Sequence, residues 1–353
     1  MKSIFDEITL NNITVKNRIA RSATHSYLGN LNGTLSRADL DIYEQVAENN
    51  NGLIFTGHCY VSEPLGKVTA DQLALYDDIF IDKFKPMIDS AHKHNCKIVA
   101  QISHAGAQSQ YKHKNGEMLA APSDIEHSAG NPACALTVPE IDRIRDDFVD
   151  AAYRAKQAGF DGIQVHCAHN YLLCEFISPV FNFRNDMYGG SVENRFRLPR
   201  EIIEGIRLKC GVNFPIFVKL NSNIERNDDS YERDLLYIIQ QLEELRIEAV
   251  ELSGCDFIAK KNSSSMFYLE RAARMKAQTN IPIILVGGIR SLEDMQRVLD
   301  SGIDMISLCR TLICEPDLIS RLISGQPKAK CINCSKCFSL PREKGIRCIL
   351  HDK

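Results

Sequence analysis

The segment IDRIRDDFVDAAYRAKQAGFDGIQVH (141–166) carries the pattern that decides the fold. Over 141–159 apolar residues recur at spacings of three and four, which indicates a helix with one buried face. The short apolar run GIQVH (162–166) then predicts a strand. The segment therefore predicts an amphipathic helix followed directly by a buried strand.

The same alternation covers nearly the whole chain. Several of the short apolar runs are almost continuously apolar, as expected for strands covered on both faces, and amphipathic stretches such as 231–245 separate them. Eight such units predict a (β/α)8 TIM barrel, with a doubly wound open sheet as the alternative. No GxGxxG follows the first strand, which counts against a Rossmann domain. The predicted strands are 18–24, 52–61, 97–103, 162–166, 215–221, 248–254, 282–288 and 304–310.

Composition narrows the class of protein. The chain has 353 residues, a length that a single α/β barrel commonly fills, and its 44% hydrophobic residues allow a core of normal size. Its net charge of −3 gives no basic field for nucleic acid. No apolar run is long enough to cross a membrane, and the N-terminus resembles no secretion signal. Scattered cysteines in such a chain predict reduced thiols and a cytoplasmic location.

Two histidines and a tyrosine gather just after the fourth predicted strand. His166, His169 and Tyr171 stand within six residues, followed by a polar loop that reaches to about residue 190. Each alone would be an ordinary loop cap or core residue. Together at the carboxyl end of a barrel strand, imidazoles and a phenol suit binding a polarised oxygen and transferring a proton. A second long connection, 104–139, is expected at the same face.

Strands seven and eight end in motifs that favour a phosphorylated ligand. Gly287 and Gly288 let the backbone approach a phosphate closely, and Arg310 offers a bidentate partner. A simple turn is the alternative for the glycine pair. The loops after these two barrel strands often bind phosphate.

Other strand ends add polar groups to the same mouth. Lys219 interrupts an apolar run, so it must meet an anion or snorkel to solvent. Gln101 offers a donor and an acceptor, and the small residues before Thr24 leave space for a flat ring. These parts suit flavin mononucleotide, although the physical argument leaves other phosphorylated ligands open.

The chain resembles the Old Yellow Enzyme family of FMN-dependent NAD(P)H oxidoreductases and ene-reductases. The resemblance spans residues 3–325 and rests on six motifs: LNNITVKNRIARSAT (10–24), HAGAQ (104–108), HCAHNYLLCEFISP (166–179), NFRNDMYGGSVENR (182–195), VGGIR (286–290) and CRTLICEPDL (309–318). It implies an FMN-filled barrel over 1–325 that passes hydride from NAD(P)H through flavin N5 to the activated C=C bond of a small α,β-unsaturated carbonyl compound.

The resemblance also implies roles for individual residues. His166 and His169 would bind the substrate oxygen, and Tyr171 would donate the proton. Flavin contacts would come from Ser22, Ala23, Thr24, Gly57, Gln101 and Lys219, with phosphate near Gly287, Gly288, Cys309 and Arg310. The chain departs from the family in having Lys219 where arginine is common, Cys309 in place of a glycine, and His58 where a smaller residue is usual.

A cysteine-rich extension, 326–353, follows the predicted barrel. Cys331, Cys334, Cys337 and Cys348 have the spacing Cys-x2-Cys-x2-Cys-x10-Cys, which favours an iron–sulfur cluster over zinc or unligated thiols. The extension resembles the [4Fe-4S] segment of the dienoyl-CoA reductase and trimethylamine dehydrogenase branch of the family.

Three functions stay open at this stage. The first is the ene-reductase-like flavoenzyme. The second is a dienoyl reductase or amine demethylase that works with an external electron-transfer partner, which the cysteines favour. The third is a non-enzymatic flavin or metal redox sensor. A homo-oligomer is compatible with all three.

Overall fold

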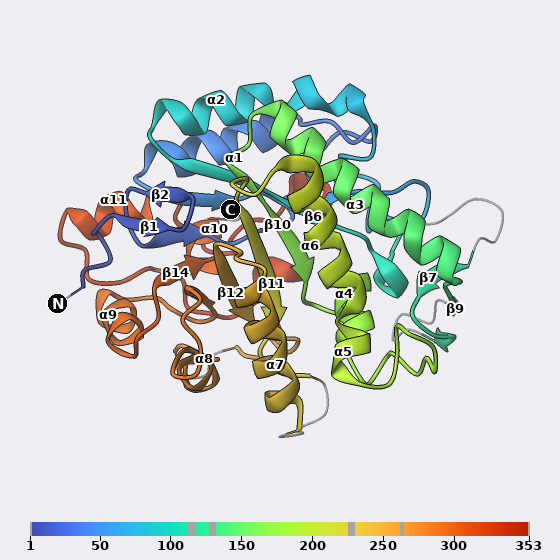
Figure 1. The fold of residues 1–353 in the computed structure, drawn as a ribbon. Coiled ribbons are helices and arrows are strands. Elements are labelled where there is room, and N and C mark those ends of the chain that lie inside the picture. The colour runs from blue at the N-terminus through green and yellow to red at the C-terminus, as the bar shows by residue number, and fades with distance from the viewer. Residues whose placement is uncertain (1, 112–117, 127–131, 225–229, 262–264, 352–353) are drawn as a thin grey trace.

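A closed barrel of parallel strands, wrapped by helices, forms the body of the chain (Figure 1). The computed structural model describes residues 2–111, 118–126, 132–224, 230–261 and 265–351. The barrel closes where β10 (Gly162–Cys167) pairs with β6 (Lys97–Ser103). The predicted (β/α)8 barrel is confirmed. Its other strands are β3 (Ile19–Arg21), β4 (Leu53–Phe55), β11 (Ile216–Asn221), β12 (Ala249–Ser253), β13 (Ile283–Val286) and β14 (Met305–Leu308).

The helices cover the outside of the barrel, as their amphipathic sequences predict. The predicted helix 141–159 is α3 (Val138–Ala158), which a Thr137–Glu140 capping box starts. Gly159 ends it in the left-handed conformation, with φ at 100°. The other long helices are α1 (Arg37–Glu48), α2 (Lys85–Lys93), α6 (Arg197–Cys210), α7 (Ser230–Glu244), α8 (Leu269–Lys276) and α9 (Leu292–Asp300).

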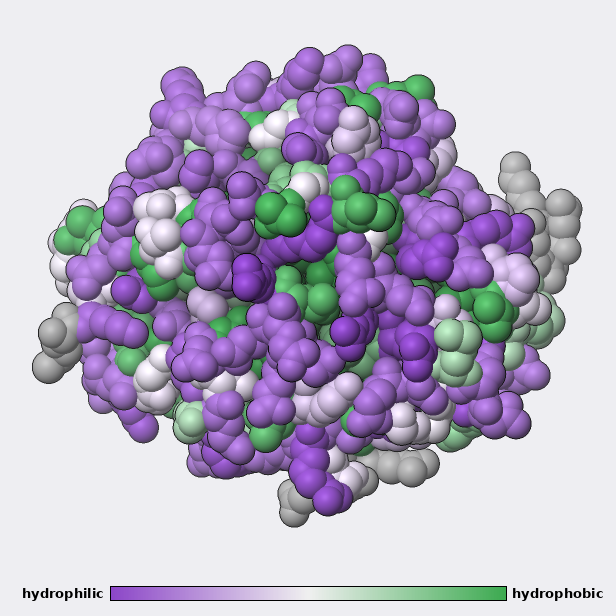
Figure 2. All heavy atoms as spheres, in the orientation of Figure 1, coloured by the Kyte–Doolittle hydropathy of each residue, from purple (hydrophilic) through white to green (hydrophobic). Residues whose placement is uncertain are grey.

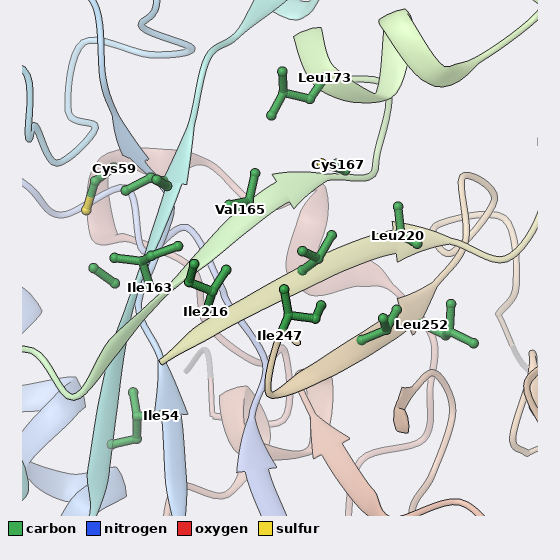
Figure 3. Packing of buried hydrophobic residues seen from close by; sticks show 14 of the residues in the cluster. Ile54, Cys59, Ile163, Val165, Cys167, Leu173, Ile216, Leu220, Ile247 and Leu252 are labelled. Atoms are coloured by element: carbon green, nitrogen blue, oxygen red, sulfur yellow. The ribbon is translucent and has the colours of Figure 1, made fainter. Parts of the chain in front are cut away.

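The strands separate two apolar regions. Outward-facing residues such as Ile163, Val165 and Leu252 join the large core between strands and helices (Figure 3). Inward-facing residues form a second cluster at the base of the barrel, and the hairpin of β1 (Ile8–Leu10) and β2 (Ile13–Val15) packs against it. The barrel interior is therefore a packed floor at this end.

One pleat further along the strands the inward positions become polar. Phe217 of the floor is followed two residues later by Lys219 on β11, and Ala249 by Glu251 on β12. Residues two apart share a face of a strand, so this change places a polar layer directly on the apolar floor. The site begins at that layer.

The second predicted strand, 52–61, is wrong in one respect, because it is two strands. β4 ends at Phe55, and a short β5 (Cys59–Tyr60) follows after a break. Within the break the backbone N–H of Gly57 donates to the Tyr43 hydroxyl at 2.8 Å. A side chain thus replaces a strand partner here, and the break brings His58 to the barrel mouth.

The two long connections carry structure of their own. The first holds η2 (Gly106–Gln108) and a small sheet of β7 (Leu119–Ala121), β8 (Ile125–Glu126) and β9 (Pro132–Ala135), while residues 112–117 and 127–131 lie outside the described part. The second begins with α4 (Leu172–Ile177) and is followed by α5 (Val192–Arg195).

The cysteine-rich extension packs against the barrel. The N–H of Ile346 donates to the carbonyl of Ser26 at 2.8 Å, and that of Ala329 to the carbonyl of Arg290 at 2.7 Å. Short turns η4 (Lys336–Phe338) and η5 (Arg342–Lys344) lie between these contacts.

The visible face of the molecule is mostly hydrophilic, with apolar side chains in small groups between polar ones (Figure 2). Throughout the described ranges, each helix is too short or too polar to cross a bilayer.

Candidate active site

A buried hydrogen-bond network forms the polar layer of the barrel. Lys219 Nζ lies 3.2 Å from Glu251 Oε2 and donates to Ser22 Oγ at 2.8 Å. Ser22 donates in turn to Glu251 Oε1 at 2.8 Å. Gln101 donates to Gln164 Oε1 at 2.7 Å, and Gln164 donates to Glu251 Oε2 at 2.9 Å. The anion that Lys219 required is therefore Glu251, three strands from Gln101 around the barrel wall.

A cavity of about 390 Å³ opens above this layer. Most of the residues predicted from the strand ends line it: Ser22, Ala23, Thr24, His169, Tyr171, Lys219, Gly287, Gly288, Cys309 and Arg310. Three predicted residues, Gly57, Gln101 and His166, are not among the residues that line the cavity. The cavity thus brings together predicted groups from the ends of strands one, four, five, seven and eight.

The two histidines and the tyrosine form one cluster. The ring centroid of His166 lies 5.3 Å from that of His169 and 5.0 Å from that of Tyr171. His169 adopts a left-handed backbone with φ at 59°, and its Nε2 is 2.8 Å from Ser253 Oγ. The backbone N–H of His169 donates to Asn221 Oδ1 at 3.1 Å. With the backbone held in this conformation, the imidazole lines the cavity. Nδ1 of His166 is buried without a hydrogen-bond partner in the described chain.

Enclosure in the barrel keeps these groups uncharged. Burial lowers the pKa of His166 well below its usual value, with smaller contributions from His169 and His58. Burial and the charge of Lys219 do the same to the pKa of His169. Burial raises the pKa of Tyr171. At neutral pH the cluster consists of neutral imidazoles and a protonated phenol, which are hydrogen-bond donors without net charge.

A chain of hydrogen bonds runs beside this cluster, from Gln72 through His58 and His25 to Asp71. Gln72 Oε1 accepts from the N–H of Val68, so its Nε2 must donate, and it reaches His58 Nδ1 at 3.2 Å. His58 therefore carries its proton on Nε2 and donates to His25 Nδ1 at 3.0 Å. His25 Nε2 then donates to Asp71 Oδ1 at 3.3 Å. Both imidazoles line the cavity, and the chain fixes their tautomers.

The opposite end of the cavity is lined by the glycine backbone of 287–288 and by the guanidinium of Arg310. Gly287 and Gly288 have φ of 137° and 74°, and a Cβ on Gly288 would come within 2.6 Å of the Phe267 ring. Arg310 lies over that ring, 5.3 Å from its centroid, and donates to Ser335 Oγ at 2.8 Å. Both glycines are thus required by the backbone, and a cation stands beside them.

Comparison with known proteins places this geometry in a family. Residues 3–329 match the model of the NADH:flavin oxidoreductase / NADH oxidase family. The chain belongs to this family. It is therefore an oxidoreductase of the flavin-dependent class, and the predicted resemblance is confirmed.

Three relatives show the extent of the likeness. The NADH oxidase of Thermoanaerobacter brockii is 33% identical over 343 residues, covering 94% of this chain and 53% of that protein. The NADPH dehydrogenase of Geobacillus thermodenitrificans is 31% identical, covering 89% of this chain and 91% of the relative. The structure of the Old Yellow Enzyme homologue from Zymomonas mobilis superposes with a TM-score of 0.80 at 27% identity, over 93% and 94% of the two chains. The chain thus spans about half of the Thermoanaerobacter relative and nearly all of the others.

The cavity of this flavin oxidoreductase fits an anionic planar cofactor. Its lining includes Lys219, Arg290, Arg310 and Arg342, with no aspartate or glutamate among the described lining residues. Ser307 Oγ is buried without a partner in the described chain. Lys219 is paired with Glu251, but the three arginines pair with no described carboxylate. Unpaired guanidinium groups and an unused hydroxyl are what a bound phosphorylated ring would satisfy.

The four cysteines of the extension meet at a second, small cavity beside α10 (Arg310–Cys314). Cys331, Cys334, Cys337 and Cys348 all line it, with isoleucine and leucine side chains around them. Burial raises the pKa of Cys337 to about 12. As they stand, no three His, Cys, Asp or Glu side chains of the described chain are arranged to hold a metal ion. The number and type of these side chains therefore suit an iron–sulfur cluster, but the thiols are not arranged as a closed metal site.

Sequence reasoning missed several residues of this site. Glu251 was taken only as part of a strand, although a buried lysine on the neighbouring strand required an anion at that level. Tyr27, Phe338 and Arg342 had no motif to mark them. The last two come from the extension, whose cysteines alone were considered, yet both line the main cavity.

Proposed function

We propose that the chain binds FMN, accepts hydride from NAD(P)H and reduces the activated C=C bond of an α,β-unsaturated carbonyl compound. One observation carries this proposal: His169, Tyr171, Lys219 and Arg310 line the same cavity. Bound FMN would supply the hydride chemistry, and the side chains must then bind the acceptor and provide a proton.

The cavity residues suit a division of labour. Gly287, Gly288, Cys309 and Arg310 would hold the phosphate, and Ser22, Ala23, Thr24 and Lys219 would hold the ring. Gly57 and Gln101, which are not among the lining residues, would support the ring from the strand ends. These assignments rest on where the structure places each side chain and on the family resemblance.

His169 and Tyr171 would act on the acceptor. A neutral imidazole N–H donates to the carbonyl oxygen and stabilises the negative charge that builds there as the β-carbon receives hydride. His166, whose ring centroid lies 5.3 Å from that of His169, would join it in binding the oxygen. Tyr171, whose raised pKa keeps its proton in place, would give that proton to the α-carbon.

Two activities separate the proposal from its alternatives. The purified protein, loaded with FMN under anaerobic conditions, should lose its oxidised flavin spectrum on adding NADPH or NADH. Adding 2-cyclohexenone should restore that spectrum and yield cyclohexanone. Flavin that binds but transfers no hydride in either step would favour the redox-sensor alternative.

We further propose that Cys331, Cys334, Cys337 and Cys348 hold a [4Fe-4S] cluster, with zinc as the competing occupant. The supporting observation is that four thiols from one short segment line a single cavity. Iron and acid-labile sulfide analysis of anaerobically purified protein tests this assignment. Zinc without sulfide would support the competitor, and absence of both would contradict any metal site.

An electron-transfer function is the second candidate. Arg310 and Cys331 line both the main cavity and the cysteine cavity, so the two cavities share a wall. A cluster there would suit a dienoyl reductase or amine demethylase that exchanges electrons with a separate protein. Turnover that requires an added electron carrier would favour this function.

The cellular setting follows from the thiols. All thirteen cysteines are free, which suits a reducing compartment such as the cytoplasm. The assembly state of the protein is open to a homo-oligomer, which sedimentation would measure.

A further inference from the structure

The cation content of the cavity wall exceeds what the cofactor site uses. Among the four cations on the wall, Lys219 is neutralised by Glu251 at 3.2 Å. Arg310 and Arg290, which is two residues after Gly288, belong to the end assigned to the phosphate. Arg342 belongs to neither group, because it enters from the cysteine-rich extension.

Arg342 is held against the cavity by a stack of aromatic rings. Its guanidinium lies 4.1 Å above the centroid of the Tyr27 ring, and Tyr27 stacks on His25 at 4.1 Å. Tyr27 has a left-handed backbone, with φ at 59°, a conformation that is uncommon for an aromatic residue. The cation–π contact holds the guanidinium against the Tyr27 ring.

The charge of Arg342 is not paired within the described chain. Its Nη2 donates to the backbone carbonyl of Phe338, and its Nη1 is shielded from solvent without a partner. Arg342 forms no ion pair with a carboxylate of the described chain. The nearby carboxylate of Asp71 is engaged by His25 at 3.3 Å and by Thr69 at 2.6 Å. A guanidinium that lines a ligand cavity and pairs with no carboxylate of the described chain is suited to bind an anion.

A series of ring contacts connects Arg342 to the end of the cavity where Tyr171 lies and where the acceptor would bind. From Tyr27 the contacts run to His25, from His25 to His58 with centroids 5.0 Å apart, and from His58 to Tyr171 at 5.1 Å. Arg310 and the glycine pair contact Phe267 instead. Arg310 therefore lies at the end of the cavity assigned to the cofactor phosphate, and Arg342 lies at the end assigned to the acceptor.

We propose that Arg342 determines specificity by binding an anionic group, such as a carboxylate, on the unsaturated carbonyl compound. This inference rests on the proposed ene-reduction, and Arg342 takes no part in the hydride or proton transfer. The guanidinium fork matches a carboxylate, and its stacking on Tyr27 leaves it preorganised. The natural acceptor would then carry negative charge away from its reacting C=C bond.

A matched pair of acceptors tests the proposal. The acid 4-(3-oxobut-1-enyl)benzoate and its methyl ester share one enone and differ in charge. The wild-type enzyme should show the higher kcat/KM with the acid. Arg342→Gln should lower kcat/KM for the acid by about tenfold or more, through KM, and change the ester by less than about twofold. Arg342→Lys should restore part of the preference.

Arg347→Gln is the control, because Arg347 lies in the same loop, outside the cavity lining, and donates to backbone carbonyls of Pro341 and Gly345. It should leave the preference for the acid unchanged. Equal losses on acid and ester in Arg342→Gln would overturn the proposal, since they would show a structural role. A change confined to the KM for NAD(P)H would also overturn it, by assigning the anion to the nucleotide.

Calorimetric binding of the acid and the ester separates this inference from the proposed function. If the wild-type protein reduces neither compound but binds the acid in a way that Arg342→Gln abolishes, the ene-reduction fails and the anion site stands. If turnover occurs and acid binding is the same in both proteins, the anion site fails and the ene-reduction stands.

Discussion

Lys219 Nζ and Glu251 Oε2 lie 3.2 Å apart inside the barrel, with side-chain exposures of 2% and 0%. They occupy directly paired positions on β11 and β12. Ser22 donates to Oε1 of Glu251, and Gln164 donates to the same Oε2 that pairs with Lys219. The pair thus anchors the polar layer that supports the cavity, and its charges depend on each other because neither reaches solvent.

Removing one partner of this pair should destabilise the fold. We expect Glu251→Ala to lower the free energy of unfolding by about 3–5 kcal/mol, because it leaves the Lys219 charge buried and unpaired. Urea unfolding followed by circular dichroism measures this. The double variant Lys219→Met/Glu251→Leu is the control and should lose less stability than Glu251→Ala alone. Equal stability of Glu251→Ala and the wild type would show that the lysine charge finds solvent.

Tyr171→Phe should affect only one half of the catalytic cycle. Reduction of the bound flavin by NADPH needs no proton from Tyr171, so its rate should stay within about twofold. Reoxidation by 2-cyclohexenone should slow about 10²–10⁴-fold, as for loss of a general acid. Stopped-flow absorbance resolves the two steps. Equal slowing of both steps would argue against a proton-donor role.

His169→Ala should weaken acceptor activation. We expect kcat/KM for 2-cyclohexenone to fall about 10²–10³-fold, as when one oxyanion donor is removed. Ser253→Ala removes the group 2.8 Å from His169 Nε2 and should cost about tenfold, because the imidazole loses orientation rather than its N–H. His94→Ala, at the end of α2, is the matched control and should retain wild-type kinetics. An unchanged His169→Ala enzyme would refute this role.

The buried imidazoles predict how stability depends on pH. Burial lowers the pKa of His58, His166 and His169 below the unfolded-state value of about 6.5. Below that value the unfolded chain binds more protons than the folded chain, so the free energy of unfolding should fall as pH falls and be fully present above it.

Urea unfolding between about pH 5 and pH 8 checks this dependence. His166→Gln should flatten the slope, because it removes one of the buried titrating groups. A free energy of unfolding that rises towards pH 5 would contradict the assignment of neutral imidazoles.

The sequence was sufficient for the barrel and for most of the cavity lining. Hydrophobic period and strand ends determine which residues face the mouth, so His169, Tyr171, Lys219 and Arg310 could be predicted. The partner of Lys219 could not be named, because strand register is a long-range property. The break after Phe55 was also missed, since it depends on how the Tyr43 hydroxyl of the preceding helix, α1, docks against the strand end.

The extension was the least predictable part. Its cysteine spacing indicates a cluster, but nothing in that spacing says where the intervening loop packs. Only the fold shows that Phe338 and Arg342 line the main cavity, and that Phe338 meets Phe257, the neighbour of His169. Contacts of this kind depend on how two surfaces dock, which local sequence patterns do not encode.

The most direct test is an anaerobic double-mixing experiment on the FMN-loaded wild-type protein. NAD(P)H is added first, and 2-cyclohexenone follows once the flavin is reduced. We predict that the flavin absorbance bleaches and then returns in step with formation of one cyclohexanone per flavin. Flavin that binds but is not reduced, or that stays reduced when the enone is added, would contradict the proposed function.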